Sequence, residues 1–112
     1  MPIGRFGKAC RLSVKSLRNY DASGLLPASF VDPRSGYRYY RLEQLARANG
    51  IRSLRLVEMP LDRIKAVLDG ADSDALLRAH LAELLGQQEE YARMVHELRH
   101  LISRRTSRCR TT

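Results

Sequence analysis

The chain has 112 residues, enough for about one domain, and it carries 20 Lys and Arg against 12 Asp and Glu, a formal charge of +8. With 44% hydrophobic and 29% charged residues, its composition is that of a folding chain and excludes a disordered one. It contains no apolar run long enough to span a membrane, and its opening residues lack the apolar stretch of a signal peptide. We therefore expect a cytoplasmic protein that does not bind membranes.

The excess positive charge lies in one half of the chain. Residues 1–56 hold eleven Lys and Arg against three Asp and Glu, whereas residues 57–112 hold nine of each sign. Such a basic half is typical of proteins that bind polyanions, because each Lys or Arg that neutralises a phosphate releases a condensed counterion. Charge alone does not separate nucleic acid from a membrane surface, so the sequence must also supply an element that fits a DNA groove.

Two short helices with a tight turn between them are predicted at the start of the chain. Apolar residues recur at helical spacing from residue 3 to residue 10, and Ser13 is a good N-cap for a second helix. That second helix carries Lys15 and Arg18 on its polar face. This is the pattern of a helix-turn-helix, in which the second helix enters the major groove of DNA. Two ordinary core helices are the alternative.

A β-hairpin is predicted over residues 28–40. The β-favouring residues 30 and 31 are followed by the turn sequence DPRSG and then by YRYY. Alternation places Tyr37 and Tyr39 on one face of the ribbon and Arg38 and Tyr40 on the other. Because so small a ribbon has no core of its own, we expect its aromatic residues both to pack on neighbouring helices and to reach phosphates as a wing.

Two further helices complete the first part of the chain. Apolar periodicity predicts one helix from about residue 41 to residue 57, which tolerates Gly50. A shorter helix starts at Pro60 and is ended by Gly70. Together with the preceding elements they form a mostly α-helical, winged helix-turn-helix DNA-binding domain over residues 1–70.

A long helix is predicted from residue 73 to residue 103, followed by a basic, solvated tail over residues 104–112. Its apolar residues follow one another at alternating steps of four and three, which is a heptad seam with seven apolar positions out of eight. A single helix of this length has no body to pack on, so we expect a coiled coil with a second copy, in which Gln88 fixes the register. Folding back on the first half of the chain, or on another domain, is the alternative. The seam consists of Leu77, Leu81, Leu84, Gln88, Tyr91, Val95, Leu98 and Ile102.

The sequence contains no pattern of catalytic or metal-binding residues. Cys10 and Cys109 lie at opposite ends of the chain without metal-ligand spacing, and His96 and His100 fall on the outer face of the heptad, away from the seam. We find no nucleophile–base pair, no paired carboxylates and no Gly-rich phosphate loop. We therefore expect neither enzyme activity nor a metal or cofactor.

Two pairs of short strings resemble the mercury-resistance regulator (MerR) family of bacterial transcription regulators. They are SVKSLRNYD with the following GLL, and SGYRYY with the following EQL. The resemblance covers residues 3–102 and is greatest for the drug-responsive branch. It implies a homodimer, joined through an antiparallel coiled coil, that binds a palindromic promoter and distorts the DNA so that RNA polymerase can engage both of its contact elements.

The resemblance also implies which residues contact DNA. In the recognition helix these are Val14, Lys15, Arg18 and Tyr20. In the first wing they are Tyr37, Arg38 and Tyr39, and in the second wing the residue is Arg55. The chain departs from the family at three positions. Asn19 stands in place of a Tyr; Arg11 stands in place of a turn Gly or Asn and must tolerate a positive φ or reshape the turn; and Gly7 replaces an Ala, which weakens the first helix slightly.

The effector is the part of the function that the resemblance leaves open. Drug-responsive members continue into a separate ligand-binding domain. The chain is therefore either a DNA-binding fragment of a longer regulator, whose small-molecule effector acts through a region outside this chain, or a short regulator that senses through the end of its coiled coil. We expect a sequence-specific transcription regulator that is nucleoid-associated when bound to DNA. The alternative is a winged-helix architectural or excision-type DNA-binding protein, but the long coiled coil argues against this alternative.

Overall fold

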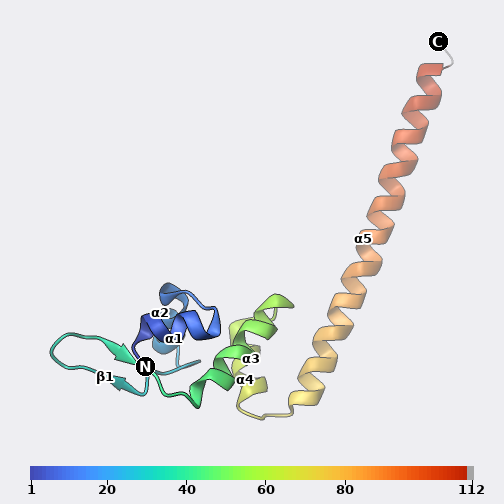
Figure 1. Cartoon of the computed structure of the whole chain (residues 1–112). Coiled ribbons are helices and arrows are strands. Elements are labelled where there is room, and N and C mark those ends of the chain that lie inside the picture. The colour runs from blue at the N-terminus through green and yellow to red at the C-terminus, as the bar shows by residue number, and fades with distance from the viewer. Residues whose placement is uncertain (111–112) are drawn as a thin grey trace. The chain divides into compact units, whose positions relative to one another are not determined.

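The computed structural model describes residues 1–110, and it describes side chains as far as residue 106 (Figure 1). The chain divides into two compact units, Met1–Ser73, which we call the head, and Asp74–Thr112, which consists almost entirely of one helix. The head contains α1 (Ile3–Cys10), α2 (Val14–Ala22), β1 (Phe30–Val31), β2 (Arg38–Tyr39), α3 (Gln44–Leu56) and α4 (Leu61–Leu68), and α5 (Ser73–Arg110) follows. The mostly helical fold with one hairpin and a long final helix, predicted from the sequence, is confirmed.

The core of the head is built from one to three apolar residues of each helix. The ring of Tyr40, directly after β2, stacks on Phe6 of α1 with ring centroids 4.5 Å apart. Leu17 of α2, Ile51 of α3 and Ile64 of α4 are fully buried around them. These contacts join all four helices of the head and the base of the hairpin into one cluster.

The hairpin pairs its two strands in the predicted place. β1 and β2 are antiparallel, with Phe30 opposite Tyr39 and Val31 opposite Arg38. The first residue of the chain extends this ribbon, because the Met1 ammonium group donates to the Tyr40 carbonyl and the Tyr40 N–H donates to the Met1 carbonyl, both at 2.7 Å. Figure 1 shows the loop of the hairpin extending away from the helices.

Two predicted helix boundaries differ from the structure. α3 starts at Gln44 and not at residue 41, because the preceding residues form a turn in which the Gln44 side chain accepts a hydrogen bond from the Arg41 N–H at 2.8 Å. α5 continues to Arg110, past the predicted end at residue 103. Residues 104–110 contain neither Gly nor Pro, and Arg has a high helix propensity, so the helix continues past the seam. Residues 111–112 of the predicted tail lie outside the described residues.

Most of the described side chains of α5 are exposed, although His80 near its start is buried. All side chains from residue 85 to residue 106 are exposed. The exposed ones include most of the predicted seam, namely Leu77, Leu81, Gln88, Tyr91, Val95, Leu98 and Ile102, while Leu84 is half-buried. As far as residue 106, this unit therefore has no core of its own.

Candidate nucleic-acid interface

The start of α2 is fixed by a cap and by a tight turn after α1. The Ser13 hydroxyl accepts a hydrogen bond from the Ser16 N–H at 3.0 Å, as an N-cap does. Arg11 ends α1 in the left-handed conformation, with φ at 58°, and the Leu12 N–H donates to the Gly7 carbonyl. The sequence left two options for Arg11, and the structure adopts the positive φ. The two helices thus form the predicted helix-turn-helix.

The two faces of α2 differ sharply in exposure. Lys15 and Arg18 are exposed, and Val14 is half-buried because it packs against the core cluster. Tyr20 is buried, since only 8% of it is exposed and its side chain belongs to the core cluster. The family pattern placed Tyr20 at the DNA, whereas its helical spacing from Leu17 turns it inward, so we leave it out of the contact set that we propose below.

The turn of the hairpin is held by its own backbone. The Gly36 N–H donates to the Asp32 carbonyl at 2.8 Å, and the Asp32 carboxylate accepts from the Arg34 N–H at 2.9 Å. Gly36 has φ at 75°, which is strained for residues with a Cβ. Tyr37 follows at the tip with 63% of its surface exposed. The tip thus presents a phenol and the exposed Arg34 to solvent.

The three residues after Tyr37 have three different environments. Tyr40 is a core residue, and Tyr39 is half-buried with its ring 5.9 Å from that of Phe30. Arg38 is half-buried, with 32% of its side chain exposed. The predicted packing of a hairpin aromatic residue on the helices is therefore confirmed for Tyr40, while Tyr37 faces solvent and its predicted phosphate contact stays a prediction.

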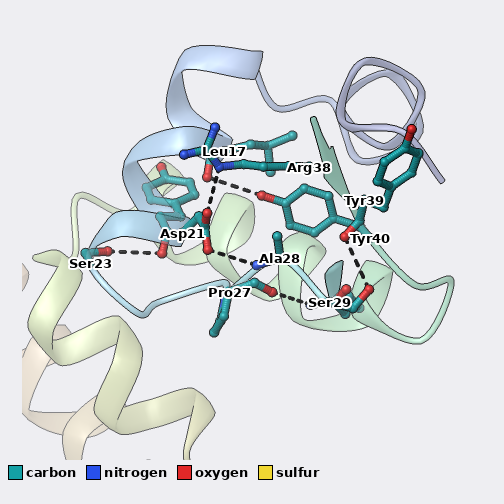
Figure 2. Close-up of polar contacts among 11 residues, drawn as sticks. Leu17, Asp21, Ser23, Pro27, Ala28, Ser29, Arg38, Tyr39 and Tyr40 are labelled. Atoms are coloured by element: carbon teal, nitrogen blue, oxygen red, sulfur yellow. Dashed lines mark hydrogen bonds and ion pairs between the residues drawn. The ribbon is translucent and has the colours of Figure 1, made fainter. Parts of the chain in front are cut away.

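The Asp21 carboxylate connects α2 to the hairpin, as Figure 2 shows. The Asp21 Oδ1 atom accepts a hydrogen bond from the Ala28 N–H at 3.0 Å, and Oδ2 accepts one from Nε of Arg38 at 2.7 Å. The Ala28 hydrogen bond, with a smaller contribution from Arg38, lowers the pKa of Asp21 below its ordinary value, although partial burial acts the other way. The role of Asp21 could not be predicted from the sequence, because its partner lies 17 residues away and no local spacing connects the two.

Arg55, the predicted second-wing residue, lies at the end of α3 and is exposed. Its Nη1 donates to the Met59 carbonyl at 3.3 Å and so braces the turn between α3 and α4. Leu56 beside it is 77% exposed. The structure therefore brings Arg38 and α2 together through Asp21, whereas the hydrogen bond of Arg55 stays within its own turn.

The described residues contain no cluster of three or more His, Cys, Asp or Glu that could hold a metal ion. Cys10 is a buried free thiol, and the side chain of Cys109 lies outside the described residues. Within residues 1–110, the structure contains no helix with both the length and the apolar character needed to cross a membrane.

Comparison with known proteins gives a consistent set of relatives. Residues 1–71 match the family model described as MerR HTH family regulatory protein. The HTH-type transcriptional regulator SkgA of Caulobacter vibrioides is 45% identical over 95 residues, which are 83% of this chain and 37% of SkgA. The multidrug-efflux transporter 1 regulator of Bacillus subtilis is 39% identical over 67 residues, covering 60% of this chain and 24% of that protein.

A solved structure agrees with these sequence matches. The EcmrR chain in a cryo-EM structure of the EcmrR–DNA complex in EcmrR-RPo superposes with a TM-score of 0.86 at 28% identity, and the match covers 96% of this chain and 40% of that one. The chain thus spans well under half the length of these three relatives.

Proposed function

The chain belongs to the MerR family of helix-turn-helix regulatory proteins, and we propose that it is a cytoplasmic, sequence-specific DNA-binding transcription regulator that acts as a homodimer on a palindromic promoter. The observation that carries this proposal is the capped helix α2, which presents Lys15 and Arg18 to solvent beside a hairpin that carries Tyr37 and Arg38. A rigid helix with exposed cations, flanked by a wing, fits a major groove and the phosphates beside it.

The contacts divide into two classes by their place in the head. Val14, Lys15 and Arg18 at the exposed side of α2 reach base edges and fix the helix in the groove. Tyr37, Arg38 and Tyr39 on the hairpin, and Arg55 at the end of α3, bind backbone phosphates. The excess of basic residues in the first half of the chain supports this assignment, since this is the part that would face the DNA.

The exposed seam of α5 and the similarity to EcmrR support two proposed partners, a second copy of the chain and RNA polymerase. We propose that the exposed seam pairs with the seam of a second chain, which sets the distance between two heads on a two-fold site. EcmrR is described on DNA within EcmrR-RPo, and by analogy this chain acts together with RNA polymerase by distorting the promoter. The match covers 37% of SkgA and 24% of the multidrug-efflux transporter 1 regulator, so we confine the proposal for this chain's own residues to DNA binding and dimerisation.

The salt dependence of DNA binding tests the proposal. If Arg38 and Arg55, the two cations assigned to phosphates, make these contacts in each head, the logarithm of the binding constant falls with the logarithm of salt concentration with a slope of about −3.6 for the dimer. Fluorescence anisotropy of a labelled promoter duplex at several salt concentrations measures this slope. A slope close to zero, or equal affinity for an uncharged polymer, would contradict duplex binding by the basic head.

Arg18→Ala and Arg38→Ala are expected to differ in kind. Loss of the recognition-helix residue Arg18 removes groove contacts, so the preference for the operator over scrambled duplexes should shrink. Loss of Arg38 removes a phosphate contact and should weaken all sequences alike, with the salt slope reduced by about 0.9 per head. Competition binding separates the two effects, and the wing assignment fails if Arg38→Ala relaxes specificity while nonspecific affinity stays unchanged.

A further inference from the structure

We propose that Asp21 is a positioning residue for DNA recognition, whose carboxylate orients the guanidinium of Arg38 so that its two Nη groups meet one backbone phosphate. This inference rests on the proposed function, since it concerns how the wing makes its contact. It assigns a role in DNA binding to a negatively charged residue, which phosphate would otherwise repel.

Asp21 hydrogen-bonds only one edge of the Arg38 guanidinium, the edge that carries Nε. Nε donates to Oδ2 of Asp21 at 2.7 Å, and the remainder of the guanidinium points away from the carboxylate in Figure 2. Within residues 1–110, the two Nη groups make no hydrogen bond to protein. Arginine carries five N–H donors in a planar fork, and a pair of them matches two phosphate oxygens. The edge left free by Asp21 therefore has the donors that a phosphate needs.

Both partners stand on elements that the core holds in place. Asp21 lies one residue after the buried Tyr20 of α2, and its Oδ1 is already anchored by the Ala28 N–H at 3.0 Å. Arg38 pairs with Val31 in the hairpin and lies two residues before the fully buried Tyr40. The side chains are only 20% and 32% exposed, respectively. Arg38 thus loses less conformational freedom on binding DNA than a free surface arginine would.

Simple electrostatics makes the opposite prediction. If Asp21 acted only through its charge, its neutralisation would raise the net charge of the head by one and tighten DNA binding. If it only held the fold together, its neutralisation would lower stability and leave the folded protein's affinity and salt slope unchanged. The positioning role predicts weaker binding together with a smaller salt slope, so the sign of the effect separates the three accounts.

Asp21→Asn in the full chain is the test variant. The amide oxygen can still accept from the Ala28 N–H, but the NH2 group that replaces Oδ2 cannot accept from Nε of Arg38. We measure the dissociation constant and the salt slope on a random-sequence duplex of about 30 base pairs, where phosphate contacts dominate binding. Binding should weaken about three- to ten-fold, and the slope should fall by about 0.9 per head.

Two further variants complete the cycle. Adding Arg38→Ala to Asp21→Asn should cause no further loss, because both changes remove the same phosphate contact. Asp74→Asn is the matched control, since it removes the same charge and breaks a similar pair, 2.8 Å to Nε of Arg78, at the start of α5. This control should bind duplex DNA as the wild type does.

Arg38→Lys decides the question if Asp21→Asn does not fold, because it keeps Asp21 and its hydrogen bond to Ala28. A single ammonium group held by Asp21 has no fork left for phosphate, so binding should weaken as it does in Asp21→Asn. Wild-type affinity in either variant, or additive losses in the double variant, would overturn the positioning role. A steep salt dependence of DNA binding by the wild type would still support the proposed function in that case. A wild type that does not bind duplex DNA would overturn both.

Discussion

The head and α5 contain similar types of apolar residues, but the head buries many of them whereas α5 leaves most of them exposed. In the head, Phe6, Leu17 and Ile51 are fully buried in one cluster that all four helices and the hairpin share. In α5, Leu98 and Ile102 are 59% and 57% exposed although they stand in a regular heptad. A short helix with neighbours in several directions completes its own core, whereas a single long helix needs another chain.

The difference between the two regions also separates their proposed roles. The head has a fixed internal structure, which a DNA-binding surface needs so that cations stay in register with phosphates. α5 has an exposed apolar seam, and in the proposed dimer this seam pairs with that of a second copy and so places two heads at a defined spacing. Changes in α5 should therefore affect DNA binding without touching any residue that contacts DNA.

The largest expected effect comes from a charge placed in the seam. Leu98→Asp buries a carboxylate in the proposed dimer interface, so the dimer should dissociate, and affinity for a two-fold DNA site should fall about 100-fold or more because two linked heads become independent. Light scattering after gel filtration, together with anisotropy, measures both quantities. His96→Asp, on the outer face two residues earlier, is the control and should remain a dimer. A dimeric Leu98→Asp would remove the support for this seam.

A methyl group added inside the head should have a moderate effect. In Gly7→Ala the new Cβ would lie 2.7 Å from the backbone oxygen of Leu12 and 3.4 Å from a methyl carbon of Leu17. The turn between α1 and α2 must then shift, so we expect a loss of about 1–3 kcal/mol in the free energy of unfolding. Urea unfolding at fixed protein concentration tests this, and an unchanged or higher midpoint would mean that the turn yields more easily than its hydrogen bonds suggest.

The same substitution in α5 should have a small effect of the opposite sign. Gly86 is exposed, and a Cβ added there would meet no atom within 4 Å. Its heptad position is on the outer face, so Gly86→Ala should raise the free energy of unfolding by up to about 1 kcal/mol per chain through helix propensity alone. The comparison with Gly7→Ala in one urea series checks that the head is packed and this face of α5 is open.

Local patterns were sufficient to predict most of the fold. The cap at Ser13, the DPRSG turn and the heptad from Leu77 to Ile102 each act over a few residues, and the elements that they predict are present. The end of α5 was predicted too early because the seam stops at Ile102, whereas the helix-favouring residues after it allow the helix to continue to Arg110. Residues 104–110 are mostly Arg and include neither Gly nor Pro.

Long-range contacts limited what could be predicted for the candidate site. Tyr20, Tyr37 and Tyr40 look alike in sequence, yet two are core residues and one is at an exposed tip, because their burial depends on which element packs against them. The pair of Asp21 and Arg38 joins elements 17 residues apart, and only the folded chain brings the two together. The exposed cations of α2 were predictable because a capped helix of known phase fixes its own faces.

Sedimentation velocity of the wild-type chain at micromolar concentration tests the central claim most directly, because it asks whether α5 is completed by a second copy. The account predicts a single species with twice the 12.8 kDa mass of one chain, which becomes a complex of two chains with one duplex when promoter DNA is added. A wild-type species of 12.8 kDa that binds DNA one chain at a time would contradict the account.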